Sequence, residues 1–501
     1  MRLLLLLFLV ACAPRPRPMP LVGAPADTQG PALVLTLAQA ELFAAPGALV
    51  NALADIDGDG DADLFVGFNG SPNRLYRNDG GAFVDIAASA GVADARPTRA
   101  AAFGDWDADG DADLLVGFAP GTGPVLRLYR NDHGHFTDAT ALAGLAVESG
   151  AVRQPVWVDF DADDDLDLFV AFRDRPNMLL RNTAGRLTDI AAEVGLADAR
   201  RSVGAVWADL DADGDLDVIV ANMDGDANGV FRNDSGRFTD VAEPWGLAWG
   251  GRTPRDAANG TVRPCVADVN GDGRLDLITA NYGTPGLFLA TVHGTWTDAG
   301  NAWGIAVDGR YDSCALADVD HDGRLDLYIN GTVTQGKNWP DYLYRNTGTA
   351  FAVVTSPALT AIPADHAAQW ADVNGDGTAD LLLAGAGPHA LLLTVQPPGL
   401  ARRSVQVRVR DARGYATRAG AEVRVYAAGT RRLLGMRLVD AGSSYDAQSD
   451  VPVHFGLGAT GRVDIEVTWP TNGVRQVTHR RGVVPGVEVI EVRTVSRGAR
   501  P

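Results

Sequence analysis

One aspartate-rich pattern occurs seven times along this chain of 501 residues, and it constrains the fold more than any other feature. The copies begin at Asp55, Asp105, Asp159, Asp209, Asp268, Asp318 and Asp372. Successive copies lie 50 to 59 residues apart. A period of this length is typical of a propeller or a solenoid, because each copy is one supersecondary unit that must bury its apolar face against a neighbour.

Each repeat is predicted to contain four short strands. In the second repeat an apolar run ends at Phe103, the acidic loop follows, and Leu114-Leu-Val116 forms the next apolar run. An alternating segment, Leu128-Tyr-Arg-Asn131, and a short segment, Phe136-Thr-Asp138, complete the repeat. Four short strands per repeat indicate one propeller blade, whereas a parallel β-helix would need much shorter coils. The sequence therefore predicts an all-β fold, a seven-bladed β-propeller with four-stranded blades over residues 32–396.

The seventh repeat lacks its last strand. After the run that ends at Thr394 the chain continues into Pro397-Pro398, with no further strand pattern. The N-terminal run Leu33-Val-Leu-Thr-Leu37 precedes the first repeat and has no repeat of its own. We expect this run to supply the missing outer strand, because closing the ring removes an exposed sheet edge.

The loop chemistry points to calcium. The first loop reads Asp55-Ile-Asp-Gly-Asp-Gly-Asp-Ala-Asp63, with oxygen side chains at positions 1, 3 and 5, Gly at position 6 and Asp at position 9. Ca²⁺ takes six to eight oxygen ligands, which carboxylates on alternate residues of a tight loop can supply. Position 7 is expected to add its carbonyl. An EF-hand is excluded, because position 12 is an apolar or Thr residue in a strand (Val66 in the first loop) where an EF-hand needs Glu.

Seven loops in register therefore predict about seven Ca²⁺ sites. The predicted ligands at positions 1, 3, 5, 7 and 9 are Asp55, Asp57, Asp59, Asp61 and Asp63; Asp105, Asp107, Asp109, Asp111 and Asp113; Asp159, Asp161, Asp163, Asp165 and Asp167; Asp209, Asp211, Asp213, Asp215 and Asp217; Asp268, Asn270, Asp272, Arg274 and Asp276; Asp318, Asp320, Asp322, Arg324 and Asp326; and Asp372, Asn374, Asp376, Thr378 and Asp380.

The seven loops differ in detail. The third has Asp164 at position 6, where we expect strain if the backbone needs a positive φ. The fifth and seventh loops carry Asn270 and Asn374 at position 3, which lowers their ligand charge. These repeats resemble the FG-GAP or VCBS repeats of integrin-α-type propellers. That resemblance implies calcium at the turn between the first two strands of a blade.

A separate small β domain is predicted over residues 399–495, with a sandwich-like fold. Its alternating strands include Val405-Gln-Val-Arg-Val409 and Glu422-Val-Arg-Val-Tyr426. From residue 397 onward 17 Arg stand against 9 Asp or Glu, a net charge of +8, which leaves −28 for residues 1–396. Opposite fields attract, so we expect this domain either to dock on the propeller or to bind anionic polymers of the cell envelope.

The same domain resembles the ASPIC/UnbV module. The resemblance rests on Gly420-Ala421, Tyr445 with Gln448-Ser449, His454-Phe-Gly-Leu-Gly458 and Trp469-Pro470, and the sequence departs from the family pattern at Thr471-Asn-Gly473. A propeller joined to this module is similar to the cartilage acidic protein family. The resemblance implies calcium binding and an extracellular interaction role, without a settled enzymatic activity.

The N-terminus reads as an export signal. Arg2 precedes an apolar run from Leu3 to Val10, and Leu9-Val-Ala-Cys12 resembles a bacterial lipobox. We expect residues 1–11 to be a lipoprotein signal peptide, Cys12 to carry the lipid anchor and the Pro-rich residues 12–31 to be a tether. The alternative is an ordinary secretory signal cleaved elsewhere. Ala13 is not Asp, which favours the outer membrane, facing the periplasm or the cell surface.

The remaining cysteines and the enzyme motifs are less informative. Cys265 and Cys314 lie three and four residues before their loops, so in a strand they would face opposite ways, and we expect buried free thiols. We find no nucleophile elbow, zinc signature or phosphate loop, and we interpret His454 as structural.

The function predicted from these features is a monomeric, non-enzymatic adhesion, interaction or scaffold protein, with a protein or envelope-glycan ligand and no nucleic acid. A carbohydrate-binding propeller is the first alternative, and a calcium-dependent polysaccharide lyase is the second. The only residues that suggest a lyase are Trp245, Trp249, Arg252 and Arg255.

Overall fold

The computed structural model describes residues 33–494 apart from residues 122, 293, 335, 363, 364, 398, 401, 443, 459 and 460. The predicted signal peptide (1–11) and the predicted tether (12–31), including the predicted lipid anchor Cys12, lie outside the described residues. No helix in the described part of the chain is long and apolar enough to cross a membrane.

The fold is all-β and propeller-like, and the strands before residue 396 group into seven four-stranded antiparallel units within the described ranges. Units 1 to 4 are β2 (Ala48–Ala54), β3 (Asp63–Phe68), β4 (Arg74–Asp79), β5 (Ala82–Asp85); β6 (Thr98–Gly104), β7 (Asp113–Phe118), β8 (Leu126–Asp132), β9 (His135–Asp138); β10 (Val152–Val158), β11 (Asp167–Phe172), β12 (Met178–Thr183), β13 (Arg186–Asp189); and β14 (Ser202–Ala208), β15 (Asp217–Asn222), β16 (Gly229–Asn233), β17 (Phe238–Asp240).

Units 5 to 7 are β18 (Gly260–Ala267), β19 (Asp276–Gly283), β20 (Gly286–Ala290), β21 (Trp296–Asp298); β22 (Gly309–Ala317), β23 (Asp326–Gly331), β26 (Tyr342–Asn346), β27 (Phe351–Val354); and β28 (Asp365–Ala371), β29 (Asp380–Gly385), β30 (Ala390–Val395), β1 (Val34–Ala38). Short connecting elements are β24 (Val333–Thr334), β25 (Lys337–Asn338), α1 (Ala87–Ala90), α2 (Ala191–Val194) and α3 (Pro357–Thr360).

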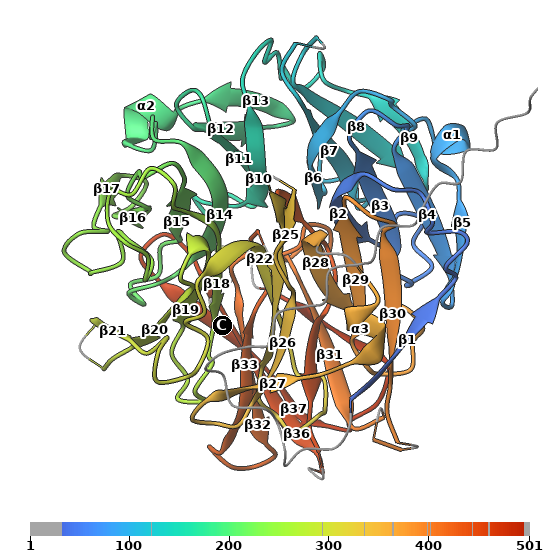
Figure 1. Ribbon diagram of the computed structural model, residues 1–501, viewed down its shortest axis with the longest axis vertical. Coiled ribbons are helices and arrows are strands. Elements are labelled where there is room, and N and C mark those ends of the chain that lie inside the picture. The colour runs from blue at the N-terminus through green and yellow to red at the C-terminus, as the bar shows by residue number, and fades with distance from the viewer. Residues whose placement is uncertain are drawn as a thin grey trace, which may run out of the picture.

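The units are arranged in a ring, with the chain colour running around it from blue to orange (Figure 1). A buried apolar cluster fills each contact between consecutive units, because successive side chains of a strand point to opposite faces and so meet the units on either side. The contact between the last unit and the first is filled in the same way, with Leu382 and Leu391 beside Leu53 and Leu64.

The predicted closure through the N-terminus is confirmed. Strand β1 pairs antiparallel with β30, in a register that sets Val34 opposite Val395 and Ala38 opposite Leu391. Figure 1 shows β1 beside β30 at the outer edge of the last unit. The first strand of the described chain therefore completes a sheet whose other strands come from residues 365–395.

The expectation of free thiols was wrong, because Cys265 and Cys314 form a disulfide. Cys265 lies on β18 and Cys314 on β22, the first strands of consecutive units. The one-residue offset does turn the two side chains to opposite faces. One face of unit 5 packs against the opposite face of unit 6, however, so the offset brings the two sulfur atoms together.

The C-terminal domain is a sandwich of two sheets. One sheet contains β31 (Ser404–Arg410), β35 (Val453–Gly456) and β38 (Val489–Arg493). The other contains β32 (Glu422–Ala427), β33 (Leu433–Leu438), β36 (Val463–Pro470) and β37 (Arg475–Val483). Alternating Val residues of the two sheets form its own buried core.

Residues 440–442 and 444–451 lie outside the two sheets and contact the first strands of several units; we call them the channel insert. Its short strand β34 (Ala447–Gln448) pairs parallel with β6, the first strand of unit 2. The carbonyls of Asp446 and Ala441 accept hydrogen bonds from Ala101 N–H at 3.1 Å and Trp207 N–H at 3.2 Å. Among the described residues, the first strand of each unit pairs with only one strand of its own unit, and the insert donates and accepts hydrogen bonds along part of the other edge. In unit 6 part of that edge pairs with β19 of unit 5 instead.

Two side chains of the insert imitate backbone pairing. The Gln448 amide accepts from Trp157 N–H at 2.6 Å and donates to the Trp157 carbonyl at 3.0 Å. The Ser449 hydroxyl accepts from Leu53 N–H at 3.0 Å and donates to the Gln369 side-chain carbonyl at 2.6 Å. The insert therefore ties together the first strands of units 1, 2, 3, 4 and 7 from one end of the channel.

Candidate metal loops and the domain that covers them

Each acidic loop connects the first and second strands of its unit, and the Asp at position 9 fixes the loop in place. Asp63 accepts hydrogen bonds from Ile56 N–H at 2.8 Å and from Asn78 N–H at 2.7 Å, at the end of the third strand. The same two contacts recur at Asp113, Asp167, Asp217, Asp276, Asp326 and Asp380. This repeated latch explains why the position is Asp in every loop.

The other loop carboxylates fold the backbone into a tight turn. Asp55 at position 1 accepts from Gly58 N–H at 2.8 Å and from Gly60 N–H at 3.1 Å, and Asp59 at position 5 accepts from Asp61 N–H at 2.9 Å. Position 6 has a positive φ, for example 95° at Gly60, which glycine adopts without strain. The loop conformation therefore follows from its Asp and Gly positions.

In at least four loops of the described part of the chain, the carboxylates of positions 1, 3 and 9 offer oxygen atoms within 4.8 Å of one another. These groups are Asp55, Asp57 and Asp63; Asp105, Asp107 and Asp113; Asp159, Asp161 and Asp167; and Asp209, Asp211 and Asp217. Clustered carboxylate oxygens are the ligands that calcium prefers.

A second observation supports a cation in these loops. Among the described residues, the Oδ1 atoms at position 3 of loops 1, 2, 3 and 6 are buried and have no hydrogen-bond partner in the protein: Asp57, Asp107, Asp161 and Asp320. A buried oxygen without a partner is costly unless a ligand satisfies it. The residues present therefore fit a hard divalent cation.

The electrostatics of the loops agree with this fit. Burial, with smaller contributions from the neighbouring carboxylates of Asp57 and Asp55, raises the pKa of Asp63 to about 7. Burial likewise raises the pKa of Asp217 and of Asp380 to about 8. A bound cation would favour the ionised carboxylates and oppose these shifts.

Position 7 has a different role from positions 1, 3 and 9. Its side chain points to the turn between the third and fourth strands, where Asp61 accepts from Gly80 N–H at 2.6 Å and Asp215 accepts from Ser235 N–H at 2.9 Å. Arg274 and Arg324 donate to the Ala290 and Asn346 carbonyls of the same turn. In these loops the side chain at position 7 therefore acts as a turn cap, whereas the buried Oγ1 of Thr378 in loop 7 has no hydrogen-bond partner among the described residues.

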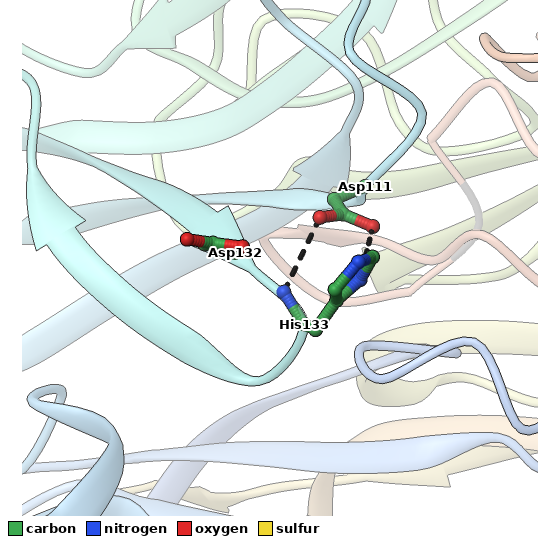
Figure 2. Close-up of side chains that lie close together, drawn as sticks. All are labelled: Asp111, Asp132 and His133. Atoms are coloured by element: carbon green, nitrogen blue, oxygen red, sulfur yellow. Dashed lines mark hydrogen bonds and ion pairs between the residues drawn. The ribbon is translucent and has the colours of Figure 1, made fainter.

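This turn cap also explains a cluster of Asp111, Asp132 and His133 on unit 2. Figure 2 shows Asp111 joined to both the backbone and the ring of His133, with His133 N–H at 3.2 Å and Nδ1 at 3.0 Å. The His133 side chain is 75% exposed. We interpret the contact between Asp111 and His133 as the position-7 turn cap of loop 2, exposed to solvent.

Loops 5 and 7 differ from the others at position 3. The amide of Asn270 donates to Asp272 at 2.9 Å, and that of Asn374 donates to Asp376 at 3.4 Å. An amide that turns its NH₂ group toward position 5 presents a donor to the loop. These two loops therefore have the weaker ligand sets.

The C-terminal sandwich covers the ends of the units where the loops lie. Side chains of this domain reach the Oδ2 atom of position 1 in four loops, with Arg408 at 3.6 Å from Asp55, Arg475 at 3.1 Å from Asp209, and Gln406 at 2.8 Å from Asp372. The fourth is Arg418, which pairs with Asp159. The basic domain thus docks on the acidic loops, as one of the two expectations from the charge distribution predicted.

The sandwich approaches the loop backbone as well. Gly473 N–H donates to the Gly214 carbonyl at 3.1 Å, and His454 Nε2 lies 2.9 Å from the Gly377 carbonyl, at position 6 of loops 4 and 7. Burial lowers the pKa of His454 to about 3, so the ring is neutral and structural. A Cβ at Gly214 would lie 2.5 Å from Val474 N, so glycine at position 6 also permits docking.

The exception at position 6 of loop 3 has a structural explanation. Asp164 has a φ of 74°, so the position does need a positive φ. Its carboxylate pairs with Arg418, and its carbonyl accepts from Arg413. Asp164 therefore keeps a left-handed backbone conformation that glycine would adopt without strain, and in return it forms an ion pair with Arg418 of the C-terminal domain.

We expect Asp164→Gly to raise the calcium affinity of the third loop about five-fold, because glycine avoids roughly 1 kcal/mol of left-handed strain. Calorimetric titration of the variant against the parent measures the change. Asp164→Ala is the matched control, since it removes the same carboxylate from the ion pair with Arg418 and keeps a Cβ on the left-handed backbone. Equal gains in the two variants would mean that the ion pair, and not the strain, weakens this loop.

Of the residues that suggested a lyase, Trp245, Trp249 and Arg252 pack in the connection between units 4 and 5, whereas Arg255 is exposed. Arg252 is 3% exposed and donates to the Asp226 carbonyl, with its guanidinium 5.3 Å from the Trp249 ring centre. Trp245 packs against the apolar cluster between the two units. Arg252 therefore has a packing role.

Comparison with protein families places two kinds of module on this chain. FG-GAP-like repeats match residues 55–116, 159–220, 209–278 and 268–329, and the ASPIC and UnbV model matches residues 413–484. The first match covers loops 1 to 6, and the second covers β32, β33, β35, β36 and β37 of the sandwich together with the channel insert.

Among curated proteins, cartilage acidic protein 1 of Xenopus tropicalis is 27% identical over 297 residues, covering 57% of this chain and 44% of that protein. The human protein is 26% identical, with 57% and 43% covered. The matched stretch thus spans less than half the length of these relatives.

Solved structures give remoter likenesses. The BBS1N chain of a complex with ARL6DN has a TM-score of 0.46 at 12% identity, covering 71% of this chain and 95% of that one. An Agrocybe aegerita lectin described as recognising terminal N-acetylglucosamine has a TM-score of 0.39 at 16% identity, covering 73% and 94%.

Proposed function

The chain belongs to the family of proteins that join FG-GAP-like repeats to an ASPIC and UnbV domain, and from this premise we propose that it is a calcium-stabilised, non-enzymatic interaction scaffold of the cell envelope. The observation that carries the proposal is the set of buried, unpartnered Oδ1 atoms at position 3 of four loops. Calcium bound in the loops would stabilise the ring and keep its surface rigid for binding a partner.

Positions 1, 3, 5 and 9 would hold the calcium ions, with the carbonyl of position 7. The bound ions would neutralise loops that hold 31 of the 63 acidic residues of the chain. The protein itself contributes the latch at position 9, which orients the loop, and the arginines of the C-terminal domain, which balance part of the remaining charge.

Calorimetric titration of chelator-treated protein tests this proposal. We expect about seven Ca²⁺ ions per chain, with loops 5 and 7 filling last because their position 3 is Asn. Asp57→Ala should remove one site, whereas Asp61→Thr should remove none, because the side chain at position 7 caps a turn and Thr378 occupies that position naturally. Binding of fewer than four ions would refute the calcium scaffold.

We also propose that Cys12 anchors the protein to the outer membrane through a lipid. Its support is the sequence Leu9-Val-Ala-Cys12 after an apolar run. We expect Cys12→Ser to abolish lipidation and leave the chain unprocessed or released, and Ala13→Asp to move it to the inner membrane. Cell fractionation with metabolic lipid labelling measures both. A processed, membrane-bound Cys12→Ser protein would contradict the anchor.

A further inference from the structure

A cavity of about 320 Å³ lies at the end of the channel opposite the acidic loops. Its walls include Arg153 on β10 and Val203 on β14, which lie near the start of the first strands of units 3 and 4. Each of these strands leads into an acidic loop at its other end. Tyr445 of the channel insert also lines it. The insert therefore closes the channel from the loop side and presents a tyrosine to the mouth on the far side.

The charge of this cavity is opposite to that of the molecule. Its lining contains three arginines, Arg153, Arg173 and Arg310, against two carboxylates, Asp224 and Asp312, although the whole chain has a net charge of −20. A net positive mouth on a strongly acidic protein is a local field that attracts an anion.

Two of the three arginines have no ion-pair partner in the described part of the chain, although Arg153 donates one hydrogen bond, to the Val152 carbonyl at 3.0 Å. Arg173 pairs with Asp224 at 2.8 Å, and Asp312 lies 2.6 Å from His366 Nδ1. Over the described ranges, Arg153 and Arg310 have no carboxylate within ion-pair distance. Arg310 instead lies over the ring of Tyr282, 4.8 Å from its centre.

We propose that this cavity binds a small hydroxylated monocarboxylate, of which a uronic acid is one source. The guanidinium groups of Arg153 and Arg310 match a carboxylate, which each can bind through two parallel hydrogen bonds. The carboxylates of Asp224 and Asp312 have spare acceptor capacity, which ligand hydroxyl groups satisfy.

The charge balance selects among anions. A lining of net charge +1 neutralises one negative charge, so a dianion such as phosphate meets uncompensated repulsion from Asp224 and Asp312. A neutral sugar leaves the arginines unpaired. The volume is at the lower end of the ~300–1,000 Å³ that is typical of small-molecule sites, and Val203, Val262 and Met223 give the wall an apolar part for the ligand ring.

This inference goes beyond the proposed scaffold function and is independent of it, because the cavity shares no residue with the loops. Calorimetry on the calcium-loaded full chain tests it with galacturonate and quinate as two sources of the same chemistry, and with galactose and inorganic phosphate as comparisons. We expect at least one of the two carboxylates to bind at least ten-fold more tightly than galactose and phosphate. Binding of galacturonate alone identifies a sugar acid, and binding of both identifies the shared chemistry.

Arg153→Gln and Arg310→Gln should each weaken the carboxylate at least ten-fold, while Arg237→Gln, an exposed arginine on the outer side of unit 4, should leave it unchanged. Calcium titration of the same variants shows whether the fold is intact, so a failure here is distinguishable from a failure of the scaffold. Galactose binding as tightly as galacturonate, phosphate binding more tightly, or no binding of either carboxylate at 10 mM (about −3 kcal/mol or weaker) would overturn the proposal.

Discussion

Chelation of calcium should lower the melting temperature of this protein by roughly 10–20 °C, more than any single substitution. At about 1 mM calcium and a Kd of about 0.1 mM, each site adds ~1.4 kcal/mol, or ~10 kcal/mol for seven independent sites. One kcal/mol shifts the melting temperature by a few degrees in small domains and by less in a chain of this size. The loops without their cation also leave buried oxygen atoms unpartnered.

Thermal melts in calcium, in magnesium and in a calcium-selective chelator measure this effect. Magnesium should restore little of the loss, because it demands a smaller and more regular ligand shell than these loops offer. The variants Asp57→Ala and Asp61→Thr separate the two kinds of acidic position, and only the first should lower the melting temperature in calcium by more than about 1 °C. Identical melting in calcium and in chelator would eliminate the stabilising role of the ion.

After calcium, the channel insert should make the second largest contribution to the free energy of unfolding. We expect Gln448→Ala to cost ~3 kcal/mol, because the variant leaves the Trp157 N–H and carbonyl groups buried without their partner. Gln476→Ala, at a half-exposed glutamine on β37 of the same domain, is the matched control and should cost less than 0.5 kcal/mol, as most surface substitutions do.

Hydrogen exchange locates the effect of Gln448→Ala. Loss of protection should appear in β10, β6 and the C-terminal sandwich, since the insert links all three. Denaturant unfolding measures the free energy. An unchanged midpoint with unchanged protection of β10 would mean that the glutamine amide contributes no net stability to the channel.

The repeated loop predicted most of the ring. Its residues indicate the local chemistry, and the spacing between copies leaves room for four short strands in each unit. The seven units follow from a period near 50 residues, and the pairing of β1 with β30 follows from a seventh repeat that lacks a strand. The role of position 9 as a backbone latch was not predicted. Its partner is a backbone N–H group of a different strand, so the Asn that recurs at that place, for example Asn78, did not reveal the contact.

The cysteines show how a correct local argument gave a wrong expectation. The one-residue offset of Cys265 and Cys314 fixes the faces to which they point, as predicted. Whether these faces meet depends on the packing of one unit against the next, which is a property of the ring. The order of the repeats already made units 5 and 6 consecutive; the missing step was that the first strands of consecutive units face each other across their contact.

The channel insert could not be predicted from the residues alone. Tyr445, Gln448 and Ser449 were notable only through the resemblance of the domain to ASPIC/UnbV modules. Gln448 and its partner Trp157 are 291 residues apart. The amide of Gln448 takes the place of a neighbouring strand at a single position. A single residue produces no periodic pattern in the sequence, so the pairing could not be predicted locally. The docking of the sandwich was foreseen from charge, but its insertion into the channel was not.

The pairing of β1 with β30 also determines the order in which this chain can fold. Strand β1 leaves the ribosome first, yet its partner is separated from it by nearly the whole ring, and the insert that completes the inner edges follows later still. Contacts of such long sequence separation form slowly, and unpaired strand edges are prone to aggregation while they wait. We therefore expect newly synthesised chains to depend on a holding chaperone until the last hundred residues have been made, and truncated chains to be cleared rather than to accumulate as partial rings.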